Sequence, residues 1–186
     1  MKKIVLIVAA AFAAVTAFAQ PKFAHVNTTE LVQLCPDTDK ARETMTAASN
    51  EAQETFNDMQ AEWNSKLQAY QSKGSTWTQA IRESKEKELT EIQQRIQEFA
   101  QTVQAELQQQ QEALMAPIYE KANTVIQDLA KKGGYVYVFD ISTLLYVDDA
   151  QSYDLTPDAR KALNIPADRT IESLQAELMA QQAALQ

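Results

Sequence analysis

Apolar residues along much of this chain recur every three or four positions. Between residues 39 and 72 they fall at Met45, Ala48, Ala52, Phe56, Met59, Trp63, Leu67 and Tyr70. Their mean spacing is about 3.6 residues and no glycine or proline interrupts them, so the pattern predicts one amphipathic helix. The pattern breaks at KGSTW, residues 73–77, which holds the only glycine of the region.

A second helix is predicted over residues 76–132. Its apolar positions are Leu89, Ile92, Ile96, Phe99 and Val103, and the stripe then shifts by one through Leu107, Leu114 and Ile118. We expect a kink at Pro117. Lys131, Lys132 and Gly133 form a typical helix stop, in which the lysines complement the helix dipole. Two long helices with narrow apolar stripes and a short turn predict an antiparallel coiled-coil arm over residues 38–132, with its tip near 73–77.

The segments on either side of the arm have β character. KFAHVN (22–27) suits a short strand, TTELVQL (28–34) a brief helical turn, and CPDTDK a helix start. YVYVFD and LLYV, within 135–147, are dense in β-formers, and Ser142-Thr143 between them predicts a β-hairpin. Three short strands would leave exposed sheet edges of the kind that other chains commonly close.

The fold predicted from these patterns is therefore mostly α, with a small β body made from residues 22–35 and 134–163 that assembles several chains. The body residues expected to hold the chains together are Val26, Tyr135, Val136, Tyr137, Val138, Phe139, Leu145 and Tyr146. Residues 166–186 continue beyond this body, and helical spacing of Ile171, Leu174 and Leu178 predicts a short additional helix there.

The first residues form a secretory signal peptide, predicted to be residues 1–19. Lys2 and Lys3 precede an apolar run from Ile4 to about Val15, and Ala17-Phe18-Ala19 supplies the small residues of a cleavage site. The mature chain would begin at Gln20 and be exported. The rest of the sequence has no apolar run long enough to cross a membrane.

Charge and cysteine content narrow the function classes. Removing Lys2 and Lys3 takes the formal charge from −8 to −10, which argues against general nucleic-acid binding. Cys35 is the only cysteine, so no intrachain disulfide can form, and packing or oligomerisation must stabilise the exported chain. Cys35 itself is best read as a small packed residue, with a cross-subunit disulfide or a reactive thiol as the alternative.

No constellation of residues indicates an enzyme, a cofactor or a metal site. His25 is the only histidine. This excludes a multi-histidine metal site within one chain and argues against a catalytic triad. A structural role in its strand is favoured over pH sensing. Asp140, Asp148, Asp149 and Asp154 could supply oxygen ligands, but their spacing fits no calcium loop, and strand-end and turn positions explain them better.

The two ends of the chain resemble the Skp/OmpH family of periplasmic chaperones. FAHVNTTELVQL and GYVYVFDISTLLYVDDAQSYDLT flank the long helical hairpin, and the match covers about residues 22–163. The family pattern is carried by Val26-Asn27, Val138-Phe139-Asp140, Tyr146 and Asp154-Leu155-Thr156. The resemblance implies a jellyfish-like homotrimer whose helical tentacles surround a cavity and hold unfolded outer-membrane proteins without ATP.

Under this resemblance the arm carries the candidate client contacts. One face of the first helix carries four candidate contacts: Phe56, Met59, Trp63 and Tyr70. The alternative role of these side chains is packing against the second helix. Trp77 at the tip is expected to be exposed. Residues 64–85 carry four basic side chains and one acidic side chain, Glu83, which gives this segment a local charge of +3. The basic residues are Lys66, Lys73, Arg82 and Lys85.

The charge of the chain departs from the family pattern, and one alternative function stays open. Typical family members are basic whereas this chain is acidic, which weakens any inference of binding to lipopolysaccharide or a membrane surface. A structural or adaptor coiled-coil protein of the cell envelope is the alternative function, and it would have a fixed partner and no preference for unfolded chains.

Overall fold

The computed structural model describes residues 21–184; the predicted signal peptide lies outside this range. The chain divides into two compact units. Residues 37–117 form the arm unit. Residues 21–36 and 118–184 form the body unit. Within residues 21–184, no helix has both the length and the hydropathy that spanning a bilayer requires.

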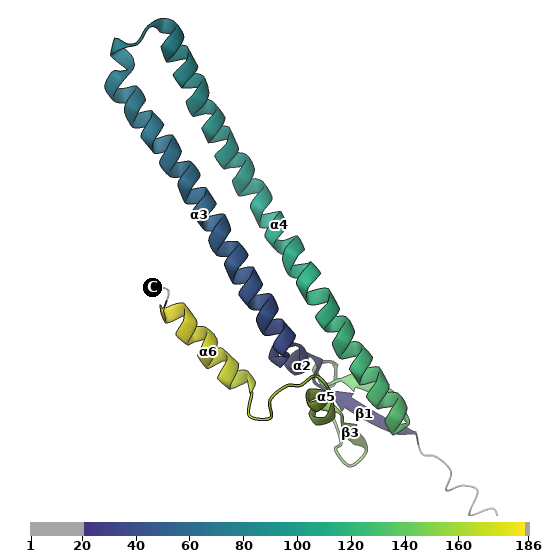
Figure 1. The fold of residues 1–186 in the computed structure, drawn as a ribbon. Coiled ribbons are helices and arrows are strands. Elements are labelled where there is room, and N and C mark those ends of the chain that lie inside the picture. The colour runs from purple at the N-terminus through teal and green to yellow at the C-terminus, as the bar shows by residue number, and fades with distance from the viewer. Residues whose placement is uncertain (1–20, 185–186) are drawn as a thin grey trace, which may run out of the picture. The chain divides into compact units, whose positions relative to one another are not determined.

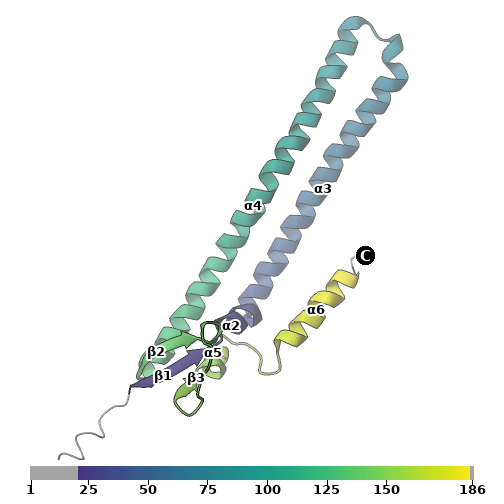
Figure 2. The same ribbon diagram turned by 180° about the vertical axis from the view of Figure 1, so that it is seen from behind.

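The arm unit is a helical hairpin. Helix α3 (Pro36–Lys73) is followed by a 3-10 turn, η1 (Gly74–Thr76), and by α4 (Gln79–Gly133). Both views show the two helices running side by side in opposite directions (Figures 1 and 2). Helix α4 is continuous through Pro117, where the two units meet in sequence. The apolar periodicity therefore predicts both long helices and the turn between them.

The body unit contains a three-stranded parallel sheet. Its strands are β1 (Lys22–Val26), β2 (Tyr135–Asp140) and β3 (Ser152–Asp154), in the order β2-β1-β3. Both outer strands pair with β1 in parallel, in registers such as Ala24 with Val138 and Ala24 with Tyr153. The predicted β-hairpin is wrong, because β2 and β3 never pair and residues 144–147 form no strand.

Local hydrogen bonds explain why the chain does not fold back after β2. Asp140 Oδ1 accepts hydrogen bonds from the Ser142 backbone N–H at 2.8 Å and from the Ser142 hydroxyl at 2.6 Å. This cap begins a 3-10 turn, η2 (Ile141–Thr143), in place of a two-residue hairpin turn. Because Ala24, His25 and Val26 are all buried, β1 takes the centre of the sheet and the later strands flank it.

Two short helices complete the core of the body unit. Helices α2 (Thr28–Leu34) and α5 (Thr156–Ala162) lie beside the sheet (Figure 2). Asn27 caps the start of α2: its Oδ1 accepts from the Glu30 N–H at 2.9 Å. The largest fully buried side chains belong to this unit: Leu31, Leu34, Cys35 and Leu163.

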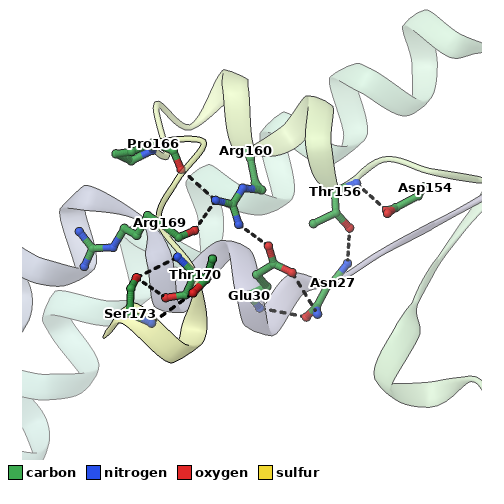
Figure 3. Close-up of polar contacts among 9 residues, drawn as sticks. All are labelled: Asn27, Glu30, Asp154, Thr156, Arg160, Pro166, Arg169, Thr170 and Ser173. Atoms are coloured by element: carbon green, nitrogen blue, oxygen red, sulfur yellow. Dashed lines mark hydrogen bonds and ion pairs between the residues drawn. The ribbon is translucent and has the colours of Figure 1, made fainter. Parts of the chain in front are cut away.

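The two terminal motifs of the sequence meet in this core. The Asn27 N–H donates to Thr156 Oγ1 at 2.9 Å, and the Leu155 N–H donates to the His25 carbonyl at 2.9 Å. Asp154 Oδ1 in turn accepts from the Thr156 N–H at 2.9 Å (Figure 3). Segments 130 residues apart in sequence are thus joined by the residues that carry the family pattern.

The C-terminal segment forms α6 (Ile171–Ala184), which packs on α2 and has one buried side chain, Leu174, only 4% exposed. Thr170 and Ser173 cap its start with reciprocal hydrogen bonds. Arg160 of α5 holds the connection: it pairs with Glu30 of α2 and donates to the carbonyls of Pro166 and Arg169 at 2.9 and 2.5 Å (Figure 3).

Candidate assembly and client-contact surfaces

One face of the sheet carries exposed aromatic rings. Phe23 and Tyr137 stack with ring centroids 6.3 Å apart, and Tyr137 lies 6.0 Å from Phe139. Tyr137 is 60% exposed and Phe139 is 42% exposed. Rings of this size are seldom left in water without a partner, and β2 and β3 each have one edge with no neighbouring strand in the described chain.

The predicted assembly residues fall into three groups in the structure. Val136, Leu145 and Tyr146 are exposed like Tyr137 and Phe139. Tyr135 and Val138 are half-buried. Val26 is 3% exposed within its own chain, so it supports β1 from inside and cannot reach a neighbouring chain.

The predicted arm stripe is partly covered along its whole length. Every stripe position of α3 from Met45 to Tyr70 is half-buried, and the residues between them are mostly exposed. Across residues 42–117, all of which the structure describes, Ile92 alone is fully buried. The candidate contacts Phe56, Met59 and Trp63 are therefore partly covered within the hairpin and still present apolar surface to solvent.

Trp63 has an additional feature that its sequence position does not reveal. Its indole nitrogen is buried and has no hydrogen-bond acceptor. An unpaired buried donor costs free energy in the isolated chain. Because the N–H makes no bond, Trp63→Phe keeps the apolar contact and removes no hydrogen bond.

Trp77 at the tip is half-buried, so the expectation that it is exposed is wrong. Its ring meets Tyr70 edge to face, with centroids 5.9 Å apart and an angle of 67° between the planes. The Tyr70 hydroxyl donates to Glu86 of α4, and this hydrogen bond raises the pKa of Tyr70. The short turn thus places Tyr70 against Trp77 and brings Glu86 of α4 to the Tyr70 hydroxyl.

The tip is less positive than the sequence window suggests. Lys66 of α3 and Lys85 of α4 both pair with Glu88, which lies just outside the window of residues 64–85. Hydrogen bonds from these two lysines lower the pKa of the Glu88 carboxyl to about 2. Lys73 and Arg82 are the two predicted cations at the tip that remain exposed without a carboxylate partner in the described structure.

The acidic residues of the body unit are caps and turn residues, as their positions in the sequence indicate. Asp148 Oδ1 accepts from the Ala150 N–H at 3.0 Å, Asp140 caps η2, and Asp154 Oδ1 accepts from the N–H of Thr156, the first residue of α5. Over residues 21–184 no three histidine, cysteine or acidic side chains gather in a way that could hold a metal ion.

His25 and Cys35 are both interior residues. His25 is 5% exposed and its Nδ1 lies 2.9 Å from the Ser152 hydroxyl, which fits the structural role favoured by the sequence. Cys35 is 1% exposed, so its thiol does not face a second chain.

Sequence reasoning missed the Arg160–Glu30 pair. Both side chains are largely buried, at 15% and 26% exposed. The sequence does hold one signal for Glu30, because Asn27-Thr28-Thr29-Glu30 is a capping-box pattern. No local pattern points to Arg160, whose partners come from α2 and from the connection to α6.

The fold defines a class of protein in which a long helical hairpin is joined to a small parallel sheet. The chain matches the family described as outer membrane protein (OmpH-like) over residues 22–163, and it belongs to that family. α6 follows the matched region.

A solved structure shows the same fold. A candidate outer membrane chaperone (OmpH-like) from Caulobacter crescentus CB15 is 17% identical, with a TM-score of 0.68. The similarity covers 82% of this chain and 92% of that one. No curated protein matches the chain in sequence.

Proposed function

We propose that the protein is an ATP-independent periplasmic holdase that binds unfolded outer-membrane β-barrel proteins and prevents their aggregation. Membership of the OmpH-like family supports a chaperone role. The observation that carries the proposal is the half-buried apolar stripe of the arm, which runs from Met45 to Tyr70 on α3 with aromatic and methionine side chains. Such side chains give adaptable, weakly selective contacts.

The proposal includes a homotrimer assembled through the sheet. A single chain leaves the outer edges of β2 and β3 unpaired and leaves Tyr137 and Phe139 exposed. Both features favour closure by copies of the same chain. Several arms would then enclose a space in which a client is separated from other clients and held by many weak contacts.

The first experiment measures aggregation. A denatured outer-membrane β-barrel protein is diluted into the mature chain, residues 20–186, and light scattering is followed. Size-exclusion chromatography with multi-angle scattering then weighs the soluble complex, for which we expect about three chains per client. A homotrimer that leaves scattering unchanged would favour the structural or adaptor role, and a monomer would contradict the assembly surface.

Variants of the sheet test assembly separately. Tyr137→Glu or Phe139→Glu places a charge on the exposed aromatic face, so the oligomer should dissociate while the helical circular dichroism signal is retained. Val138→Glu is a weaker test because Val138 is half-buried in its own chain. Met179→Glu, at a residue 69% exposed on α6, is the matched control and should leave the oligomer intact.

A further inference from the structure

An open cleft of about 620 Å³ lies in the body unit, and its lining includes none of Phe23, Tyr137 and Phe139. It is lined by the end of α4, by β2 and β3, and by α5. Its volume is in the range of cavities that hold small ligands or single side chains with their backbone. Of the predicted assembly residues only Tyr135 lines it, and none of the arm contacts does.

Two stacked tyrosines line the cleft. Tyr135 of β2 and Tyr153 of β3 lie with ring centroids 5.8 Å apart and 19° between their planes, although β1 separates their strands. Between them β1 carries Ala24, which pairs in register with Tyr153. The pairing of β1 with β2 is irregular between Lys22 and Phe23, so Tyr135 and Tyr137 pair with consecutive residues of β1. Tyr135 can thus turn away from the aromatic face that Tyr137 occupies.

Both rings are held in place before any ligand binds. A Cβ added at Gly133 would lie 2.2 Å from Cε2 of Tyr135, so only glycine lets this ring approach the end of α4 so closely. The Tyr153 hydroxyl donates to Asp158 Oδ2 at 3.0 Å. This hydrogen bond raises the pKa of Tyr153, which keeps the hydroxyl protonated. A fixed aromatic surface of this kind favours binding of a planar or apolar side chain.

The charged side chains of the cleft indicate which polar groups a ligand would carry beside its ring. Lys132 at the end of α4 and Lys161 at the end of α5 line it, and among the described residues neither ammonium group has a carboxylate partner. Asp158 is the acidic residue of the lining and is already engaged by Tyr153. Two cations and one carboxylate favour a monoanion over a dianion, and the remaining acceptor capacity of Asp158 suits an N–H donor.

We propose that this cleft binds the carboxyl-terminal residue of an unfolded polypeptide when that residue is aromatic. The ring would lie on Tyr135 and Tyr153, the terminal carboxylate would pair with Lys132 and Lys161, and the backbone N–H would face Asp158. A chain terminus is the part of a polypeptide that combines these three groups. The inference rests on the proposed function for the source of the chain, and it adds a specific contact to the weak contacts of the arm.

The test uses fluorescently labelled five-residue peptides and the mature chain, residues 20–186, with fluorescence anisotropy as the readout. A peptide ending in phenylalanine with a free carboxylate should bind about tenfold more tightly than the same peptide ending in an amide. A peptide ending in alanine should also bind about tenfold more weakly, because it lacks the ring. Equal binding of the acid and amide peptides would overturn the proposal without any variant being made.

Variants then locate the binding. The pair Lys132→Gln and Lys161→Gln should lose the preference for the acid peptide, whereas Lys132→Arg and Lys161→Arg should keep it. The matched control is the pair Lys40→Gln and Lys87→Gln, which removes the same charge from the arm unit. An equal loss in the control pair, or competition by inorganic phosphate at the peptide's own concentration, would overturn the assignment to this cleft.

The same proteins are assayed for suppression of client aggregation. Suppression without peptide binding would overturn this inference alone. Peptide binding without suppression would overturn the proposed holdase function alone.

Discussion

The body unit and the arm unit bury their apolar residues in different ways. In the body, Leu31, Leu34 and Leu163 are at most 1% exposed, and Ala24 and Ala159 are inaccessible. In the arm, the large apolar side chains of α3 are all half-buried, and between residues 42 and 117 only Ile92 is fully buried. The body therefore has a core of its own, whereas the arm has two helix faces that cover each other incompletely.

This difference indicates that the two units have different roles. Full burial stabilises one arrangement of the body, because each core residue loses contacts if it moves. Half-burial stabilises the arm less and leaves apolar surface that a client can share. Ion pairs between the helices compensate in part: Arg95 of α4 lies 3.0 Å from Glu62 of α3, and Lys66 pairs with Glu88. Solvent reaches both pairs, so each is worth little alone.

The largest predicted effect comes from a matched pair of leucine substitutions. Leu31→Ala in the body should lower the free energy of unfolding by about 3 kcal/mol, because it leaves a cavity at a fully buried site. Leu67→Ala in the arm removes the same atoms from a half-buried site and should cost about 1 kcal/mol. Urea unfolding at one fixed chain concentration measures both, and equal costs would contradict the distinction between the two units.

The next effect concerns Arg160 and its polar contacts in the body unit. Arg160→Met should cost about 2 kcal/mol, because it removes two carbonyl contacts and leaves Glu30 without its cation in a largely buried position. The loss should also speed hydrogen exchange of α6 amides, which Arg160 helps to position. Arg95→Met breaks an exposed pair of the arm and serves as the control. Unchanged exchange in α6 would show that Leu174 alone holds the helix.

The smallest effect concerns charge at the tip. The Glu88 pKa is lowered from 4.5 to about 2, so its ion pairs stabilise the folded arm fully above about pH 4.5 and lose this contribution as the pH falls toward 2. Glu88→Gln should lower the thermal unfolding midpoint slightly at neutral pH, and its difference from the parent chain should vanish in acid. Glu91→Gln, whose pair with Lys87 is exposed at 3.7 Å, should show a smaller difference. A difference for Glu88→Gln that persists in acid would contradict the ion-pair explanation.

The sequence predicts the arm better than the body, for a physical reason. Helical periodicity is local, so the stripe from Met45 to Tyr70 identifies both the helix and the face that is covered. Strand pairing is not local: YVYVFD and LLYV have the composition of a hairpin, but their pairing depends on β1, more than a hundred residues earlier. The cap at Asp140 decides against the hairpin, and that cap depends on a side-chain hydrogen bond.

The candidate surfaces too could be predicted where they depend on local sequence, and not where they depend on contacts between distant segments. Tyr137, Phe139 and Tyr146 are exposed at positions that the β-rich segment indicates. Trp77 is covered because Tyr70, seven residues earlier, folds back across the turn. The cleft between α4 and α5 could not be predicted at all, since it depends on the close approach of Tyr135 to Gly133 and on two lysines from separate helices.

Tryptophan fluorescence tests the central claim most directly. The chain has two tryptophans, Trp63 and Trp77, and both belong to the arm unit. Adding an unfolded outer-membrane protein whose own tryptophans have been replaced should shift their emission to shorter wavelength and reduce quenching by acrylamide, because the client covers the arm stripe. Trp77→Phe should retain most of the change through Trp63. Emission and quenching that stay unchanged while aggregation is suppressed would contradict client binding by the arm.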